Sequence, residues 1–196
     1  SLAENWEGRY GDLQKLTDAR LAQLQTSKSE WHARRARVIL QSRASKGKLP
    51  DAVYEQLRDV YKSHSNSDYQ LRAMWTMHVT GGFKPDELAG ALKSKDEYIR
   101  AWAIQLLCED GSPSREILAQ FIRMAEEDPS PVVRLYLASA LQRVDEPAAW
   151  SITEELIPHE EDRDDHNLPK MIWFGIEPLV ADDPDKGLAL AVESRL

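Results

Sequence analysis

The amino-acid sequence predicts an all-α fold, a right-handed α–α superhelix (solenoid) of about five helix pairs. The first observation is composition: Ala, Leu, Arg, Glu and Gln dominate, and only 9 of the 196 residues are glycine, so intrinsic preference favours helix nearly throughout. The second is a short motif that recurs along the chain. A period of about 30 to 45 residues built from two helices is typical of repeats that bury their apolar faces by stacking on neighbours.

The recurring motif begins with an acidic residue or Ser and ends four residues later with Arg, which follows an apolar residue or Ala. It occurs at residues 30–34, 68–72, 96–100 and 130–134. Each copy continues with apolar residues at helical spacing, so each predicts the start of the second helix of a repeat. A hydroxyl three residues before a carboxylate, the spacing of a capping box, supports three of these starts, and an Asp before a first-turn Pro supports the fourth. The predicted caps are Ser27, Ser65, Ser94 and Asp128.

The first helices of the repeats are predicted from shorter amphipathic stretches between the motifs. These stretches cover residues 18–25, 52–62, 86–92 and 114–125. A fifth pair is predicted at 148–156 and 168–180, and a further element begins at 184. Gly81 with Gly82, and Gly111 with Pro113, are predicted to be turns within one domain that covers residues 1–196.

Charge and cysteine content exclude several classes of site. The net charge is −8, from 25 basic and 33 acidic residues, which disfavours a general phosphate-binding surface because such surfaces cluster cations. Cys108 is the only cysteine, so no internal disulfide can form, and no zinc or haem attachment motif occurs. No apolar stretch reaches the roughly 20 residues that span a bilayer, and we therefore expect no membrane insertion of this segment.

Two longer strings resemble a known family. The string WHARRARVILQ covers residues 31–41, and DHNLPKMIWFGIEPL covers residues 165–179. The arginine motif resembles the HEAT-repeat superfamily, which includes HEAT/ARM-like solenoids. The two strings are similar to the helical-repeat region of large exported proteins of planctomycete and verrucomicrobial bacteria that are named membrane-bound dehydrogenases. In those proteins a β-propeller precedes the repeats and a c-type haem domain follows.

The resemblance implies that this chain is one segment of a longer multidomain redox protein, located in the periplasm or exported. The chain opens at Ser1 without an initiator methionine and ends within a helical pattern, and we expect it to be excised from such a parent. Any redox chemistry would then lie outside this segment. The fifth copy has Pro169 after Leu168 and lacks the Arg of the other copies. We interpret it as a last repeat that departs from the pattern.

The densest group of potential metal ligands lies between the helices of the fifth pair. It consists of His159, Glu160, Glu161, Asp162, Asp164, Asp165 and His166, and mixed carboxylate and imidazole sets bind divalent metals. The EF-hand spacing is absent, however. A solvated acidic loop in which the Asp165 region caps the next helix explains the same residues and is the favoured interpretation, so no residue is assigned to a metal.

The arginines at the second helices are the candidate interaction surface. They are Arg34, Arg35, Arg72, Arg100 and Arg134. One alternative is that the Arg-rich helix with Trp31 and His32 contacts nucleic acid, as in HEAT-like DNA glycosylases. The other is that the arginines bridge neighbouring repeats through acidic residues at helix starts, which recurrence at every repeat favours.

Aromatic residues and Cys108 have structural interpretations of the same kind. The aromatic residues at second helices and near them are Trp31, Tyr69, Tyr98, Trp102, Tyr136, Trp150 and Trp173. They could form a recognition stripe, but packing between stacked helices is favoured. Cys108 lies on an apolar face and is predicted to be a buried small hydrophobe rather than a nucleophile.

The sequence therefore predicts a non-catalytic scaffold or protein-interaction module with no catalytic residue and no cofactor. The expected partner is another protein or the flanking domains of the same chain. Nucleic-acid binding is the disfavoured alternative.

Overall fold

The computed structural model describes residues 11–111 and 113–196, and every regular element in these ranges is a helix. The chain divides into two compact units, unit 1 (Ser1–Lys84) and unit 2 (Pro85–Leu196). The expectation that the chain is part of a longer protein was based in part on Ser1, and this residue lies outside the described residues. Within the described ranges no helix is long and apolar enough to cross a membrane.

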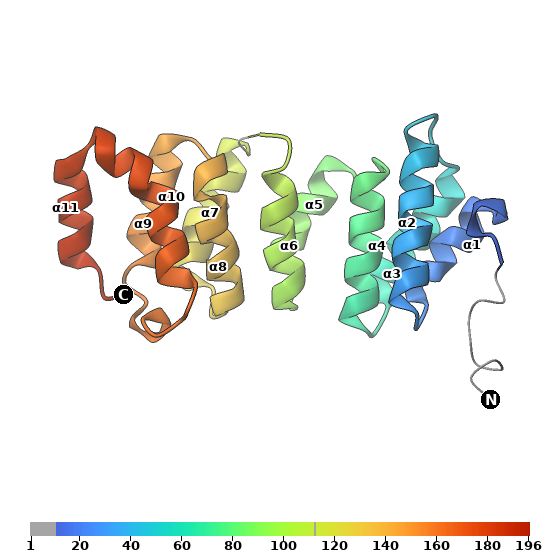
Figure 1. Cartoon of the computed structure of the whole chain (residues 1–196), viewed down its shortest axis with the longest axis horizontal. Helices are drawn as coiled ribbons and strands as arrows, with labels where there is room; N and C mark the ends of the chain where they lie inside the picture. Colours follow the sequence, from blue (N-terminus) through green and yellow to red (C-terminus); the bar gives the residue numbers. More distant parts are fainter. Residues whose placement is uncertain (1–10, 112) are drawn as a thin grey trace. The chain divides into compact units, whose positions relative to one another are not determined.

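The described part of unit 1, residues 11–84, contains four α-helices and two short 3₁₀ turns (Figure 1). In chain order they are η2 (Leu13–Lys15), α1 (Asp18–Gln23), η3 (Leu24–Thr26), α2 (Glu30–Ala44), α3 (Asp51–Ser63) and α4 (Ser67–Val79). The predicted first helices at 18–25 and 52–62 correspond to α1 with η3 and to α3.

Unit 2 contains seven α-helices and two 3₁₀ turns among its described residues. In chain order they are α5 (Pro85–Ala91), α6 (Glu97–Leu107), α7 (Arg115–Glu127), α8 (Pro131–Ala140), η4 (Leu141–Arg143), α9 (Glu146–Leu156), η5 (Glu160–Asp162), α10 (Leu168–Asp182) and α11 (Pro184–Glu193). The fifth pair predicted at 148–156 and 168–180 is α9 with α10, and α11 is the further element.

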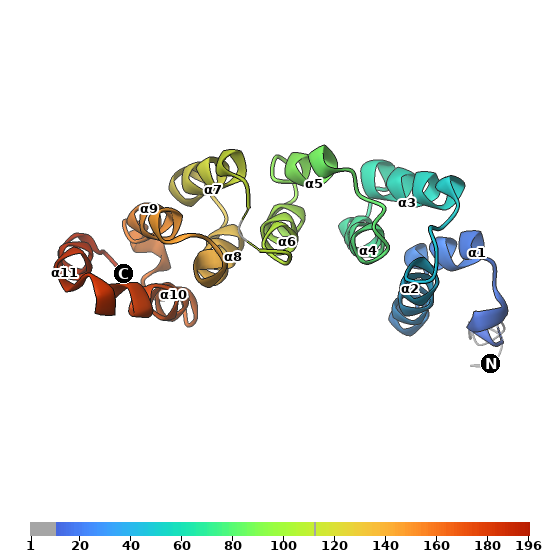
Figure 2. The ribbon, with the colours of Figure 1, turned by 90° about the horizontal axis from the view of Figure 1, so that it is seen from above.

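Each unit is built from two layers of helices (Figure 2). In unit 2, α6 packs on α8 and α8 on α10, which forms the layer of second helices, while α7 packs on α9 in the layer of first helices. In unit 1, α1 packs on α3 and α2 on α4 in the same manner. Pairing within repeats and stacking between them is the arrangement of a helical solenoid, so the predicted fold class is confirmed. That the two units make up one domain stays a prediction.

The two layers differ in how much of each helix is buried. First helices such as α7 bury a single stripe, with Leu118, Phe121 and Met124 inside. Second helices such as α6 are enclosed on more sides and bury even Ala101 and Ala103. The buried residues of α6 therefore lie on several sides of the helix, whereas those of α7 lie on one face.

The predicted helix caps were wrong by one residue at α4 and by two residues at α2, α6 and α8. The N-caps of the second helices α2, α4, α6 and α8 are Ser29, Asn66, Asp96 and Ser130. At three of the four starts, the predicted residue makes a side-chain turn just before the helix, as in Ser94, whose Oγ accepts from the Asp96 amide at 3.2 Å. Asp96 then accepts from the amides of Tyr98 and Ile99, the bonds of a true cap. At each of these starts, one polar side chain therefore forms the turn before the helix and a second one, two residues later, caps the helix.

Candidate functional site

Three of the five candidate arginines are bound within the fold. Arg72 and Arg134 are buried, and the side chain of Arg100 is 12% exposed. Arg72 donates to the carbonyl of Ser27 at 2.7 Å and pairs with Glu30 at the start of α2. The predicted bridging between repeats is thus confirmed for these residues, because their guanidiniums bind groups of neighbouring helices. Whether any of them also contacts a partner stays a prediction.

Asp128 contacts the arginines of two successive repeats of unit 2: its side chain binds Arg100 of the preceding repeat, and its backbone binds Arg134 of its own repeat. Its carboxylate accepts two hydrogen bonds from Arg100, from Nε and Nη2 at 2.7 Å each. Its carbonyl accepts from Nη1 of Arg134 at 2.9 Å. Arg134 in turn donates Nη2 to Asp162 at 2.7 Å. Each carboxylate follows its arginine by 28 residues, so the spacing of Asp128 and Asp162 repeats the spacing of the arginines themselves.

Arg34 and Arg35 differ from the other candidate arginines because both are exposed. The side chain of Arg34 is 71% exposed and, among the residues that the structure describes, forms its ion pair within its own helix, with Glu30 at 2.9 Å. The expected bridge from Arg34 to a neighbouring repeat is therefore wrong. Arg35 borders a cavity of about 420 Å³ together with Val38 and Lys46. Among the candidate surface, these two side chains are the ones that solvent reaches freely.

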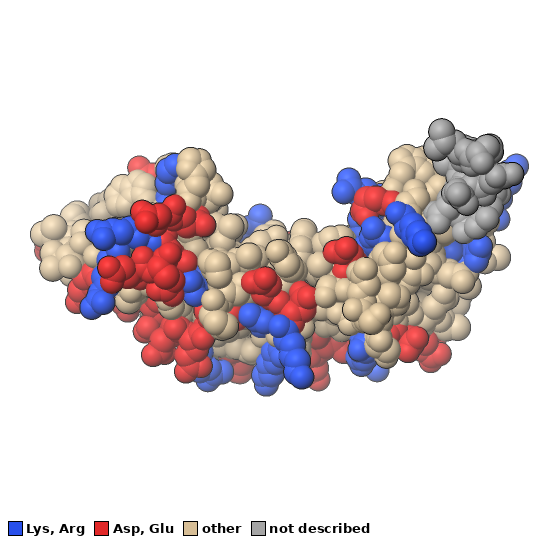
Figure 3. All heavy atoms as spheres, turned by 90° about the horizontal axis from the view of Figure 1, so that it is seen from below, with Lys and Arg blue, Asp and Glu red and all other residues tan. Residues whose placement is uncertain are grey.

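The acidic segment at 159–166 is held by structural contacts. His159 lies between Glu161, 2.9 Å from Nδ1, and the carbonyl of Ala125, 2.7 Å from Nε2. Asp162 is buried against Arg134, and Asp165 accepts from the amides at the start of α10, which keeps its pKa below the usual value. Within the described ranges, no three His, Cys, Asp or Glu side chains are arranged to hold a metal. Acidic side chains nevertheless gather on the face of unit 2 drawn in Figure 3.

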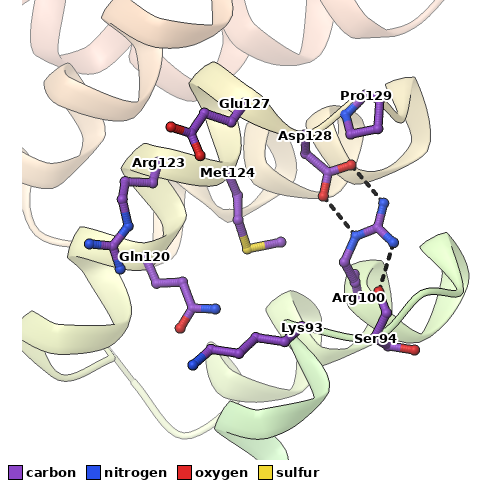
Figure 4. A pocket seen from close by; sticks show the side chains of 9 residues that line it. All are labelled: Lys93, Ser94, Arg100, Gln120, Arg123, Met124, Glu127, Asp128 and Pro129. Atoms are coloured by element: carbon purple, nitrogen blue, oxygen red, sulfur yellow. Dashed lines mark hydrogen bonds and ion pairs between the residues drawn. The ribbon is translucent and has the colours of Figure 1, made fainter.

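A cleft of about 440 Å³ lies between the loop after α5 and helix α7 (Figure 4). Its charged lining consists of three cations and two carboxylates: Arg100 turns to Asp128, while Lys93 and Arg123 face the same space as Glu127. Met124 points into its centre. The Arg100 and Asp128 pair that closes one side belongs to the contacts between repeats, so the cleft is a gap beside that structural bridge.

A second hollow, which we call the second-helix groove, crosses α6, α8 and the start of α10. It has a volume of about 510 Å³. It is lined by Trp102, Gln105, Glu109, Leu135, Tyr136, Ser139, Asn167 and Met171. Because the lining comes from three successive second helices, the groove depends on the stacking of repeats rather than on any one of them.

The floor of the second-helix groove is aromatic and its sides carry neutral polar groups. The rings of Trp102 and Tyr136 are tilted by 57° with centroids 6.1 Å apart, and both side chains are half-buried. Burial raises the pKa of Tyr136, so its hydroxyl stays protonated and can donate at neutral pH. Amide groups of Gln105 and Asn167 can donate and accept at once. Half-buried Trp and Tyr beside such groups are typical of protein contact surfaces.

The aromatic residues do not share one environment. Trp150 is buried in the core, as predicted. The packing prediction was wrong for Trp31, Tyr98 and Trp173, which are 64%, 51% and 50% exposed. Cys108 is buried, as predicted, and burial raises the pKa of its thiol to about 11 although Arg143 opposes the shift.

The sequence interpretation missed most of the second-helix groove. Trp102 and Tyr136 were recognised as aromatic residues of second helices, but the polar residues between them were not. Gln105 and Ser139 lie three residues after Trp102 and Tyr136, respectively, one turn further along each helix. This recurrence at a 34-residue interval was the available signal.

Comparison with known proteins gives one match. A family model described as HEAT repeats matches residues 85–166, which runs from α5 to the loop before α10. No curated protein matches, and no solved structure matches. The matched segment contains the helix pairs α5 with α6 and α7 with α8, together with α9. Residues 85–166 are thus similar to HEAT repeats in sequence, and the two-layer packing of unit 2 agrees with that similarity.

Proposed function

We propose that this chain is a non-catalytic helical-repeat scaffold that binds a protein partner through the second-helix groove of unit 2. HEAT repeats generally serve as scaffolds or interaction modules. The observation that carries the proposal is the pairing of Trp102 and Tyr136 over a hollow of about 510 Å³. A hollow of this size accommodates one or two side chains of a partner, and half-buried aromatic rings make strong anchors for them.

The chemistry of the groove supports protein recognition over catalysis. Its ionisable lining is Glu109 and Tyr136, which does not amount to a nucleophile with a base or to a pair of carboxylates. The neutral groups of Gln105, Ser139 and Asn167 match the alternating donors and acceptors of a peptide backbone. The groove therefore suits an extended segment that places an apolar side chain on the two rings.

We further propose that the partner is a flanking domain of a longer exported redox protein. The support for this is the resemblance of residues 31–41 and 165–179 to the helical repeats of membrane-bound dehydrogenases. In such a parent this segment would hold a propeller and a haem domain in place.

Isothermal titration of this chain with the separately expressed flanking domains of the same gene tests both proposals. We expect saturable binding that Trp102→Ala and Tyr136→Ala each weaken by at least about ten-fold, because anchors in desolvated hollows dominate interface energies. Tyr98→Ala is the matched control, since Tyr98 lies on α6 outside the groove and is 51% exposed. Circular dichroism melting verifies that each variant is folded.

The two proposals fail in different ways. Saturable binding that the groove variants leave unchanged, or that Tyr98→Ala weakens equally, excludes the groove as the contact. If neither flanking domain binds, the linking role is excluded. In that case, photo-crosslinking from position Ser139 in the full-length protein, with position Glu126 as control, still tests the groove alone.

A further inference from the structure

The charges of the chain are divided between its two units. Unit 1 has 14 Lys and Arg and 9 Asp and Glu, a net charge of +5, whereas unit 2 has 11 and 24, a net charge of −13. Helix α2 is the most basic element. After Glu30 it carries Arg34, Arg35, Arg37 and Arg43 and no further acidic residue.

Three guanidiniums of unit 1 share one carboxylate. Arg34 on α2 donates to Glu30 at 2.9 Å, and Arg72 on α4 pairs with the other oxygen of the same carboxylate. Arg37 interacts electrostatically with Glu30 and with both of these arginines. Burial tends to raise the pKa of Glu30, but the bonds and charges of Arg34 and Arg72 lower it overall. The cluster therefore holds three positive charges and one negative charge.

Arg37 is the least satisfied member of this cluster. Its Nη1 is buried and has no hydrogen-bond partner among the residues that the structure describes. Its guanidinium lies 5.1 Å from the centre of the Trp75 ring. Burial, together with the charges of Arg34 and Arg72, lowers the pKa of Arg37, and Glu30 offsets only part of this. A buried cationic donor without a partner is unfavourable. A carboxylate that accepted a hydrogen bond from this donor would remove that cost.

The surface beside the cluster is apolar and exposed. Trp31 is 64% exposed and Val38 is 50% exposed. With Arg34 between them, these residues follow the spacing of three and four that places side chains on one face of a helix. The exposed face of α2 thus combines two cations, Arg34 and Arg35, with an aromatic ring and an aliphatic side chain.

We propose that α2 and α4 form a binding site for an acidic protein segment, in which Arg37 and Arg34 hold a carboxylate while Trp31 and Val38 contact neighbouring apolar side chains. Arg37 is partly exposed, so rotation of its side chain brings the guanidinium to a carboxylate at the surface. Arg34 is held by one exposed pair with Glu30 and can turn to the same ligand. Guanidinium and carboxylate form the strong two-bond pairs that this arrangement favours.

The apolar flank favours a protein segment over nucleic acid. Nucleic-acid affinity grows with the number of phosphates that are neutralised along the backbone, which requires a row of cations rather than one cluster. Here Trp31 and Val38 interrupt the cationic face, and the whole chain carries a net charge of −8. An acidic segment with apolar side chains satisfies both parts of the surface.

A fluorescein-labelled peptide of about 15 residues, in which pairs of Glu alternate with pairs of Leu, probes this surface as an amphipathic helix would. Fluorescence anisotropy with the full chain at low salt measures its affinity. We expect saturable binding that Arg37→Met and Arg34→Met each weaken by about ten-fold, because a charge-assisted pair is lost. Arg115→Met, which removes an exposed arginine from α7 in unit 2, should leave the affinity within about two-fold.

Four outcomes would overturn the proposal. They are no saturable binding at low salt, equal affinity for a peptide with Gln in place of Glu, equal losses for Arg37→Met and Arg115→Met, and displacement of the peptide by a lower concentration of duplex DNA. Sedimentation velocity adds a fifth: a dimer that Arg37→Met dissociates would assign this face to a second copy. Trp102→Ala should not alter peptide binding, so this test is independent of the second-helix groove.

Stability separates a binding role from a structural one. Met has a volume similar to the buried part of Arg and leaves no donor without a partner, so Arg37→Met should keep or raise the urea midpoint of the chain. Weaker peptide binding with an unchanged or higher midpoint supports the site. A lowered midpoint would show that Arg37 contributes to the fold, and Arg34→Met, at a 71% exposed position, would then decide the matter by its peptide affinity.

Discussion

At the scale of single residues, the arginines of this chain differ in whether their guanidiniums are satisfied by partners within the fold. Arg134 and Asp162 are 2% and 3% exposed and satisfy each other through two hydrogen bonds. Arg37 is also partly buried, yet its Nη1 lacks a partner among the described residues. The same residue type in the same kind of helix therefore stabilises the stack in one repeat, whereas in another it has the unsatisfied donor on which the proposed binding site is based.

Removing one partner of the buried Arg134 and Asp162 pair should destabilise the fold far more than replacing both partners with apolar residues. Asp162→Asn removes the buried charge partner of Arg134 and leaves only the 61% exposed Glu161, 3.3 Å from Nη2. We expect a loss of about 3 to 5 kcal/mol in the free energy of unfolding. The double variant Arg134→Met with Asp162→Leu should recover most of this loss, since both charges are gone. Urea unfolding of the single and double variants measures both values. Additive losses would contradict a coupling between the two residues.

Cys108 predicts a specific dependence of stability on pH. Its pKa is about 11 in the folded chain, against an ordinary value of 9.0. A raised folded pKa gives stability that is fully present below pH 9 and is lost as pH rises to 11. The loss should reach about 2 to 3 kcal/mol. Comparing urea unfolding of the wild type and Cys108→Ala between pH 8 and pH 11 isolates this residue, because other groups titrate equally in both. A stability difference that stays constant over this range would contradict the assignment.

At the scale of elements, the ends of helices depend on close contacts that few residues permit. Gly82 follows α4, and a Cβ at this position would lie 2.2 Å from the ring of Tyr54. Tyr54 cannot easily move away, because its hydroxyl donates to the carbonyl of Thr80 at 2.7 Å. The Tyr54 ring therefore connects helix α3 to the turn after α4, through its packing on Gly82 and its hydrogen bond to Thr80.

Two glycine variants should change stability in opposite directions. Gly82→Ala should destabilise the chain by about 1 to 3 kcal/mol through overpacking against Tyr54. Gly90→Ala, inside α5 with nothing within 4 Å of the added Cβ, should stabilise it by about 0.5 to 1 kcal/mol because alanine favours helix. Thermal unfolding followed by circular dichroism measures both. A neutral Gly82→Ala would mean that the Tyr54 ring can shift without cost.

At the scale of the whole molecule, the repeat pattern predicts one domain over residues 1–196. Stacked repeats unfold together when the coupling between neighbours is strong. We therefore expect a single calorimetric transition whose calorimetric and van't Hoff enthalpies agree. Two transitions, of which only one moves in the Asp162→Asn variant, would instead make unit 1 and unit 2 separate domains.

The sequence by itself determined the elements and their order. Helix propensity, apolar spacing and the recurring arginines located the helix pairs to within a few residues and predicted that the arginines connect repeats. These properties act over a few neighbouring residues, so they are legible in a linear string. Even the error of one or two residues at the caps arose locally. At α6, for example, Ser94 and Asp96 are both residue types that cap helices well, and the Ser94 hydroxyl is used in the turn that precedes the helix.

Only the tertiary structure decided which side chains are covered. Trp31 and Trp150 have the same residue type, yet one is 64% exposed and the other 3%, because exposure depends on which helices stack against each face. The partners of Arg100 and Arg134 lie 28 residues away, and the second-helix groove draws on three helices. Local spacing cannot predict such features, since burial and ion pairing are set by contacts between segments that are far apart in the chain.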